Sequence, residues 1–209
     1  MGADTSFNLS NVFAAVAETI PDHTYVVWRD RRLTYAEADA RIDGFARYLA
    51  SVGLGCHTER DALDGHESGQ DHLGIYLRNG NEYLETMIGS YRARVAPFNA
   101  SYRYVEEELV YLLTDSKARA LVYPAEFATR VAAIRDRLPA LEVLIQVADG
   151  SGNELLPGAV DYETILGTPA PANGLPTRSG DDLYILYTGG TTGMPKGVLW
   201  RQHDIFVSY

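Results

Sequence analysis

The chain has 209 residues, of which 46% are hydrophobic and 22% are charged, and its formal net charge is −10. This composition is that of an ordinary soluble globular protein with a hydrophobic core of normal size. The acidic balance argues against a general affinity for DNA, RNA or anionic lipid, because these partners require a basic surface.

The cysteine content and the N-terminal residues indicate the cellular compartment of the protein. The chain has one cysteine, Cys56, so no intrachain disulfide can form, and a reducing compartment is favoured. Residues 1–11 are polar and lack the apolar core of a signal peptide. Because no apolar run is long enough to cross a bilayer, we expect a cytoplasmic protein without a transmembrane segment. Nothing in the sequence predicts an oligomeric state.

The first quarter of the chain is predicted to form two helices joined by a short hairpin. The predicted elements are a helix over 9–19, a hairpin over 24–34 and a helix between residues 34 and 53. Asn8 or Ser10 caps the first helix, and Pro21 ends it. Thr34 and Glu37 have the spacing of a capping box for the second helix.

A polar segment over residues 55–71 follows neither the helical nor the strand period, and it is predicted to be a surface loop. His57, His66 and His72 lie in or beside it among several acidic residues, which raises the alternative of a metal site. Their spacings of nine and six residues match no zinc-ligand pattern, so the solvated loop is favoured.

From residue 72 onward, strand-like and helix-like segments alternate. Strands are predicted over 72–77, 95–98, 119–123 and 141–147, with helices over 81–93, 105–114 and 126–138 between them. This alternation predicts an α/β fold with a mainly parallel sheet and flanking helices. Residues 148–181 are rich in glycine and proline and are predicted to be connector, apart from a short apolar pattern over 160–166.

The last predicted elements are a strand over 183–187, a glycine-rich loop, a strand over 198–200 and a helix starting at Asp204. The loop, residues 188–197, holds four glycines, three threonines and one lysine. A polyphosphate needs backbone N–H groups turned toward it, which glycine permits, together with hydroxyl donors and a positive charge. A flexible linker is the alternative, but the spacing favours an ATP-phosphate loop. His203 either faces this loop or serves the first turn of the final helix.

Two common nucleotide motifs do not fit this loop. A Walker A loop has glycine before its lysine and serine or threonine after it, whereas Lys196 lies between Pro195 and Gly197. The dinucleotide fingerprint Gly-x-Gly-x-x-Gly has a different glycine spacing and opens directly into a helix. The stretch Tyr187-Thr-Gly-Gly-Thr-Thr-Gly-Met-Pro-Lys-Gly197 instead agrees with the signature Tyr-Thr-(Ser/Gly)-Gly-Thr-Thr-Gly-x-Pro-Lys-Gly of adenylate-forming enzymes.

With this loop, the chain resembles the acyl- and aryl-CoA synthetases, which share their fold with luciferases and peptide-synthetase adenylation domains. Further segments similar to that family are residues 33–37 (LTYAE), 74–83, 92–104 and 119–123. The similarity is greatest to actinobacterial fatty-acyl-CoA and steroid side-chain-CoA ligases, and residues 55–71 are the main departure. The resemblance implies that residues 1–209 are the N-terminal part of an adenylation domain, forming its first subdomain.

The resemblance also implies a reaction and a set of site residues. A fatty or other hydrophobic carboxylic acid would react with ATP to form an acyl-adenylate, which CoA would then convert to a thioester. Thr188 would donate its hydroxyl to a Mg²⁺ site, and Lys196 would be the catalytic residue that holds the departing pyrophosphate. The residues that would wrap the β- and γ-phosphates are Gly189, Gly190, Thr191, Thr192 and Gly193. ATP, Mg²⁺ and CoA are thus the expected ligands.

The family's acidic Mg²⁺ ligand, ribose-binding aspartate, hinge and C-terminal lysine would follow Tyr209, together with a small C-terminal domain. The 209-residue chain is therefore expected to be inactive alone, as a piece of a longer ligase. Two alternatives stay open. One is a fatty-acyl-AMP ligase that loads a carrier protein, and the other is a non-catalytic nucleotide- or partner-binding module.

Overall fold

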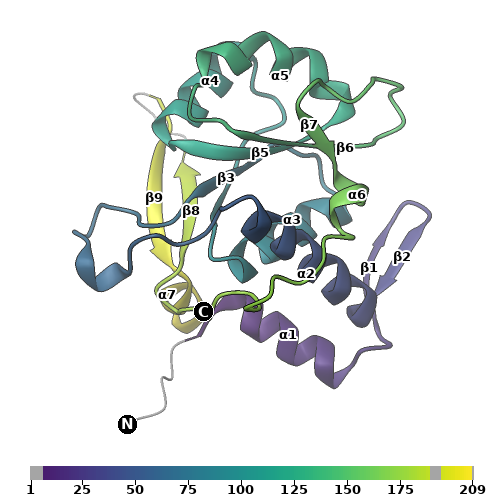
Figure 1. Ribbon diagram of the computed structural model, residues 1–209, viewed down its shortest axis with the longest axis vertical. Coiled ribbons are helices and arrows are strands. Elements are labelled where there is room, and N and C mark those ends of the chain that lie inside the picture. Colours follow the sequence, from purple (N-terminus) through teal and green to yellow (C-terminus); the bar gives the residue numbers. More distant parts are fainter. Residues whose placement is uncertain (1–6, 189–193, 209) are drawn as a thin grey trace.

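The computed structural model describes residues 7–188 and 194–208. Within them the chain forms a seven-stranded sheet, in the order β7-β6-β5-β3-β4-β8-β9, with helices on both faces (Figure 1). Its strands are β3 (His72–Ile75), β4 (Ala96–Asn99), β5 (Ala118–Pro124), β6 (Val143–Val147), β7 (Ala159–Asp161), β8 (Leu183–Thr188) and β9 (Lys196–Arg201). All neighbours pair in parallel except β8 and β9, which confirms the predicted mainly parallel α/β fold.

The helices and the separate hairpin surround this sheet. The helices are α1 (Leu9–Thr19), α2 (Tyr35–Ser51), α3 (Asn81–Arg92), α4 (Glu106–Asp115), α5 (Ala128–Ile134), α6 (Tyr162–Ile165) and α7 (Gln202–Val207). The hairpin consists of β1 (Thr24–Trp28) and β2 (Arg31–Thr34), and short 3₁₀ turns occur at Arg60–Ala62, Ala125–Phe127 and Arg135–Arg137. Helices α4 and α5 cover one face of the sheet, and α2 and α3 cover the other (Figure 1).

Local capping signals place the first helices where the sequence predicts them. The Asn8 side chain accepts a hydrogen bond from the Ser10 N–H at 2.9 Å, so Asn8 is the N-cap of α1. At α2 the Thr34 hydroxyl accepts from the Glu37 N–H at 3.2 Å, and the Glu37 carboxylate accepts from the Thr34 N–H at 2.8 Å. This reciprocal pair is the predicted capping box, and it satisfies two N–H groups that have no partner inside the helix.

The interior strand β5 is buried on both faces because its side chains alternate between two core clusters. Leu121 packs toward α4 and α5, whereas its neighbour Val122 packs toward α2 and α3. Both residues are fully buried, as expected for a strand in the middle of a parallel sheet. Gly89 allows α3 to approach α2 closely, since a Cβ there would lie 2.8 Å from Cδ1 of Phe45.

The prediction of connector over residues 148–181 is wrong in one part. Residues 159–161 form β7, which pairs in parallel with β6 and extends the sheet, and α6 follows directly. The Asp161 carboxylate caps α6 by accepting from the Thr164 N–H at 2.8 Å. A three-residue strand is too short to show an alternating pattern in the sequence, so pairing with β6 decides its structure. The predicted helix over 126–138 is also shorter than expected, since only α5 is α-helical.

The predicted surface loop over residues 55–71 is mostly exposed, with one 3₁₀ turn. His57 Nε2 lies 2.6 Å from Asp71 Oδ2, and the His72 ring contacts the Ser116 carbonyl and the Ser68 hydroxyl. Among the described residues, no three His, Cys, Asp or Glu side chains are close enough together to hold a metal ion. His57 and His72 therefore take part in local hydrogen bonds.

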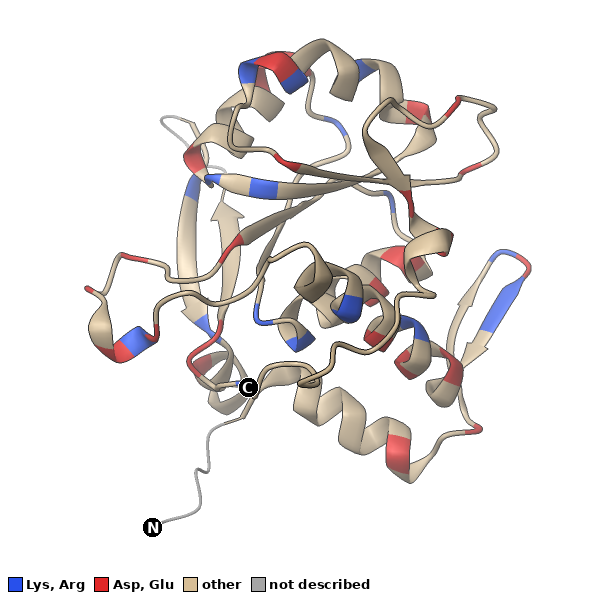
Figure 2. Ribbon diagram, viewed as in Figure 1, with Lys and Arg blue, Asp and Glu red and all other residues tan. Residues whose placement is uncertain are grey.

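Charged residues of both signs are interspersed along the ribbon, without a continuous blue stripe in the part that the structure describes (Figure 2). Many arginines pair individually with carboxylates, and the exposed pairs include Arg137 with Glu107. In the same described residues, no helix combines the length and the apolar character that crossing a bilayer requires.

A network of ion pairs joins the β1–β2 hairpin, α2, α3 and α6. The Arg41 guanidinium contacts the buried Glu85 carboxylate and the Glu163 carboxylate, each at 2.8 Å, and Arg31 lies 3.0 Å from Glu163. Hydrogen bonding to Arg41, reinforced by Arg31, lowers the pKa of Glu163 to about 2. The network therefore links the hairpin to the helices on one face of the sheet.

We expect Glu163→Gln to lower the free energy of unfolding by about 1 kcal/mol at neutral pH, because the carboxylate is half exposed and partly screened. The folded-state pKa lies below the ordinary 4.5, so the contribution is complete above pH 4.5 and is lost as the pH falls toward 2. Urea titrations of both proteins from neutral pH down to about pH 3 measure this difference. A difference that does not shrink with falling pH would mean that packing, and not charge, is responsible.

Candidate functional site

The glycine- and threonine-rich loop is held by the β8–β9 hairpin. Backbone pairing runs from Leu183 opposite Arg201 to Thr188 opposite Lys196, so the strands stay paired up to the mouth of the loop. β9 begins at Lys196, two residues before the strand predicted over 198–200, and α7 begins at Gln202, two residues before Asp204. The predicted phosphate ligands of residues 189–193 (Gly189, Gly190, Thr191, Thr192 and Gly193) lie outside the described residues.

Thr188 and Lys196, the predicted site residues that the structure describes, face each other across the hairpin. Directly paired residues of an antiparallel ladder point to the same face, with Cα atoms roughly 5 Å apart. Both side chains are exposed. The pair therefore places a hydroxyl and an ammonium group side by side at the entrance to the loop.

The same face of the hairpin continues as an apolar strip. The next pairs along it are Leu186 with Val198 and Tyr184 with Trp200. Leu186, Val198 and Trp200 are 37%, 42% and 41% exposed, which is high for large apolar residues in a sheet. This face thus offers polar contacts at the loop and apolar contacts along the remaining length of the strands.

The opposite face of the hairpin packs against α4 through Tyr187. The Tyr187 hydroxyl donates to Asp115 Oδ2 at 2.7 Å, and burial, followed by the nearby Asp115, raises the pKa of this phenol well above its usual range. The phenol therefore stays a neutral donor at physiological pH. Gly197 lies against the ring, and a Cβ at that position would come within 3.0 Å of Tyr187 Cζ.

The position of the loop in the sheet suits a ligand. β8 runs parallel to its neighbour β4, and the loop leaves the carboxyl end of β8. Ligands of open α/β sheets bind at this edge, outside the carboxyl ends of the strands. Mg²⁺ is commonly held by one or two protein oxygens, substrate phosphates and water, so the Thr188 hydroxyl fits such a site as one ligand.

Two grooves that the sequence did not predict lie beside the sheet. One, of about 420 Å³, is lined by Asp115, Tyr187 and Gly197 together with residues 66–68 of the surface loop. The other, of about 870 Å³, lies where β3, β5 and β6 end, beside the β1–β2 turn. The larger groove is lined by three arginines and four carboxylates, Arg29, Arg31, Arg78, Asp30, Glu82, Glu126 and Asp149. Because the carboxylates outnumber the arginines by one, the larger groove does not form a basic phosphate-binding surface.

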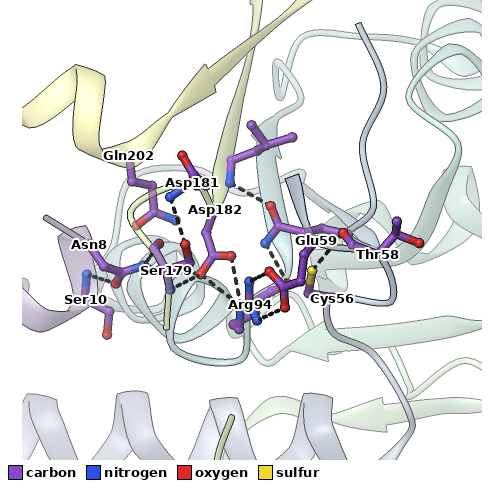
Figure 3. Close-up of polar contacts among 12 residues, drawn as sticks. Asn8, Ser10, Cys56, Thr58, Glu59, Arg94, Ser179, Asp181, Asp182 and Gln202 are labelled. Atoms are coloured by element: carbon purple, nitrogen blue, oxygen red, sulfur yellow. Dashed lines mark hydrogen bonds and ion pairs between the residues drawn. The ribbon is translucent and has the colours of Figure 1, made fainter. Parts of the chain in front are cut away.

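A buried polar network fixes the other end of the hairpin (Figure 3). Arg94 contacts Asp182 at 2.9 Å and Glu59 at 2.7 Å, and the Asp182 side chain is almost fully buried. Asp182 also accepts from the Ser179 N–H at 3.0 Å and from Asn8 Nδ2 at 3.4 Å. Burial raises the pKa of Asp182 even with the arginine beside it. These contacts hold the start of β8 against α1 and the surface loop.

His203 lies in α7, at the end of the hairpin away from the phosphate loop. Its Nδ1 accepts from the Phe7 N–H at 3.1 Å, and its ring stacks on Phe7 with centroids 6.1 Å apart. His203 therefore lies in the first turn of the final helix, as the second interpretation predicts, but its ring connects α7 to the segment before α1.

Comparison with known proteins adds to this geometry. The profile of the family described as AMP-binding enzyme matches residues 13–209. The chain is 59% identical to the medium-chain acyl-CoA ligase Mig of Mycobacterium avium, over 98% of this chain and 37% of that protein. It is 34% identical to a 3-oxocholest-4-en-26-oate–CoA ligase of Rhodococcus rhodochrous, over 96% of this chain and 34% of that protein. The chain thus spans about a third of the length of these relatives.

Solved structures show the same fold. The crystal structure of the anthranilate CoA ligase AuaEII in complex with anthranoyl-AMP superposes with a TM-score of 0.81 at 18% identity, covering 97% of this chain and 36% of that one. A likeness at this level of identity concerns the arrangement of the elements, and it agrees with the predicted α/β fold.

Proposed function

The chain belongs to the AMP-binding enzyme family, and we propose that it forms the ATP-phosphate-binding part of a ligase that joins a hydrophobic carboxylic acid to CoA. In this proposal residues 1–209 are the N-terminal part of the adenylation domain. The observation that carries the proposal is the pairing of Thr188 with Lys196 at the mouth of the glycine- and threonine-rich loop. A hydroxyl group and a cation beside a glycine-rich backbone are suited to binding a polyphosphate.

The proposed reaction has two steps. The substrate carboxylate attacks the α-phosphorus of ATP, the bond to the β-phosphate oxygen breaks, and pyrophosphate leaves. The thiol of CoA then attacks the acyl carbon, and AMP leaves as the thioester forms. The Lys196 ammonium would stabilise the charge that develops on the departing pyrophosphate. The Thr188 hydroxyl would help to hold Mg²⁺, which would supply positive charge that offsets the charge of the phosphates, and residues 189–193 would donate backbone N–H groups.

The proposed acid substrate and the proposed acyl acceptor are supported by the exposed apolar strip and by the relatives. Both relatives named above are CoA ligases, one for medium-chain acyl groups and one for a steroid acid, which supports CoA over a carrier protein. A fatty or other hydrophobic acid agrees with the exposed strip of Leu186, Val198 and Trp200. We also propose a cytoplasmic location, where ATP and CoA are available and a single free cysteine stays reduced.

The decisive experiment is ATP–pyrophosphate exchange by the full-length protein across a panel of carboxylic acids. We expect exchange with medium-chain or longer acids, no exchange when Mg²⁺ is withheld, and thioester formation once CoA is added. The 209-residue chain alone is expected to show no thioester formation, since it spans about a third of its relatives. If no acid supports exchange, the non-catalytic module is the better description. If exchange occurs but only a carrier protein accepts the acyl group, the proposal of CoA as the acyl acceptor is wrong.

A further inference from the structure

Both described ends of the glycine- and threonine-rich loop are held by one face of α4. The Tyr111 hydroxyl donates to the Pro195 carbonyl at 3.0 Å, immediately before Lys196. Asp115 accepts from the Tyr187 hydroxyl at 2.7 Å, immediately before Thr188. Tyr111 and Asp115 are four residues apart, so they lie on the same side of the helix. One helical turn therefore contacts the residues that flank both proposed phosphate ligands.

Helix α4 is itself firmly placed. Leu109, Leu112 and Leu113 are at most 2% exposed in the core cluster beneath it. At its N-terminus the Glu108 carboxylate accepts from the Val105 N–H at 3.0 Å, and Glu107 pairs with Arg137 at 2.7 Å. A helix fixed by its core face and its cap can hold a loop in one position, because its side chains have little freedom to follow the loop.

The two contacts are not needed to form the hairpin. Six cross-strand pairs already join β8 and β9, from Leu183 to Thr188. Pro195 lacks an N–H, so its carbonyl is its only backbone hydrogen-bonding group, and Tyr111 satisfies that group from outside the hairpin. The raised pKa of Tyr187 keeps its hydroxyl protonated as the donor to Asp115. The contacts thus act where the strands end and the loop begins.

We propose that Tyr111 and Asp115 are positioning residues that orient the two ends of the phosphate loop, and with them Thr188 and Lys196. We call Tyr111 and Asp115 the anchor residues. This inference rests on the proposed function, because it assigns the anchor residues to ATP and pyrophosphate binding. Neither residue needs to touch the substrate. Their effect passes through Pro195 and Tyr187, which set the direction in which the loop leaves the sheet.

The test compares Tyr111→Phe and Asp115→Ala in the full-length protein with two control variants. Tyr48→Phe removes the hydroxyl of a tyrosine that is half-buried in the opposite core cluster, and Thr114→Ala alters an exposed neighbour on α4. We expect each anchor variant to raise KM for ATP and for pyrophosphate about fivefold to tenfold, the effect of one lost hydrogen bond. KM for the acid should stay within about twofold, since the acid is proposed to bind the strip of Leu186, Val198 and Trp200 and not the ends of the loop. Asp115→Asn keeps an acceptor oxygen and should restore most of the loss.

A second measurement reads the anchoring without relying on activity. Hydrogen–deuterium exchange of the peptide spanning residues 186–198 should be faster in both anchor variants than in the wild type, and unchanged in the controls. A peptide from β5 should exchange alike in all proteins, which shows that the variants are folded. If both anchor variants keep the wild-type KM values and the wild-type rates of hydrogen–deuterium exchange, the positioning role is overturned. If the wild type catalyses no pyrophosphate exchange with any acid, the proposed function fails, and the hydrogen–deuterium data still decide the anchoring.

Discussion

Replacing Lys196 with methionine is expected to lower kcat/KM for ATP–pyrophosphate exchange by about 10²- to 10³-fold, the usual loss when a preorganised stabilising group is removed. Lys196 is the first residue of β9, and its position is fixed by pairing with Thr188. Methionine keeps the length of the side chain and removes its charge. The loss should therefore be mainly in kcat, because charge accumulates on the leaving pyrophosphate in the transition state.

The chain offers a matched control for this substitution. Lys117 is its only other lysine, and it is also exposed. Lys117→Met is expected to leave the exchange rate within about twofold, since Lys117 lines the smaller groove and is not one of the proposed phosphate ligands. Lys196→Arg should recover part of the activity, because it keeps the charge with a different geometry. Equal rates for Lys196→Met and the wild type would remove Lys196 from the proposed mechanism.

Replacing Arg94 with methionine is expected to lower the free energy of unfolding by about 3 to 5 kcal/mol at neutral pH, as for other broken buried ion pairs. The Asp182 side chain is 1% exposed, and Arg94 is the cation that pairs with it in the described structure. The remaining donors, Ser179 and Asn8, are neutral, so the carboxylate would be left buried without a counter-charge. Urea titration of both proteins measures the difference.

An exposed ion pair of similar geometry serves as the control for Arg94. Arg137 contacts both carboxylate oxygens of Glu107 at 2.7 and 2.8 Å, but the two side chains are 45% and 77% exposed. Arg137→Met should therefore cost less than about 1 kcal/mol. Because burial already raises the pKa of Asp182, the deficit of Arg94→Met should shrink as the pH falls and the carboxyl takes up a proton. Equal losses for the two variants would contradict burial as the cause.

Several parts of the fold could be predicted because their signals lie within a few residues of one another. The capping box joins residues three apart, and the alternation of Leu121 and Val122 between two core clusters follows from the strand period. The composition of the loop likewise predicts polyphosphate binding, because it lies within ten residues. The loop and the similar segments upstream of it are enough to identify the family from the sequence. Among the predicted site residues, Thr188 and Lys196 lie together, and the roles of these two residues and of residues 189–193 stay predictions.

Other parts could not be predicted, because a partner distant in the sequence decides them. β7 has only three residues, and it becomes a strand by pairing with β6. Tyr111 reaches Pro195 across 84 positions, and Arg94 reaches Asp182 across 88. A tyrosine in a helix or an arginine before a strand carries no local sign of such a partner. The strength of these contacts depends on burial, which exists only once the chain has folded.

The sequence by itself therefore determined the α/β class and the family, and it predicts the phosphate loop, since these depend on local period, composition and motif. The tertiary structure alone decided how the loop is held. It brings one turn of α4 against both ends of the loop and closes the base of the hairpin with a buried ion pair. The physical reason is that hydrogen bonds and charge pairs need distant groups at contact distance and shielded from water, and packing around the sheet meets both conditions.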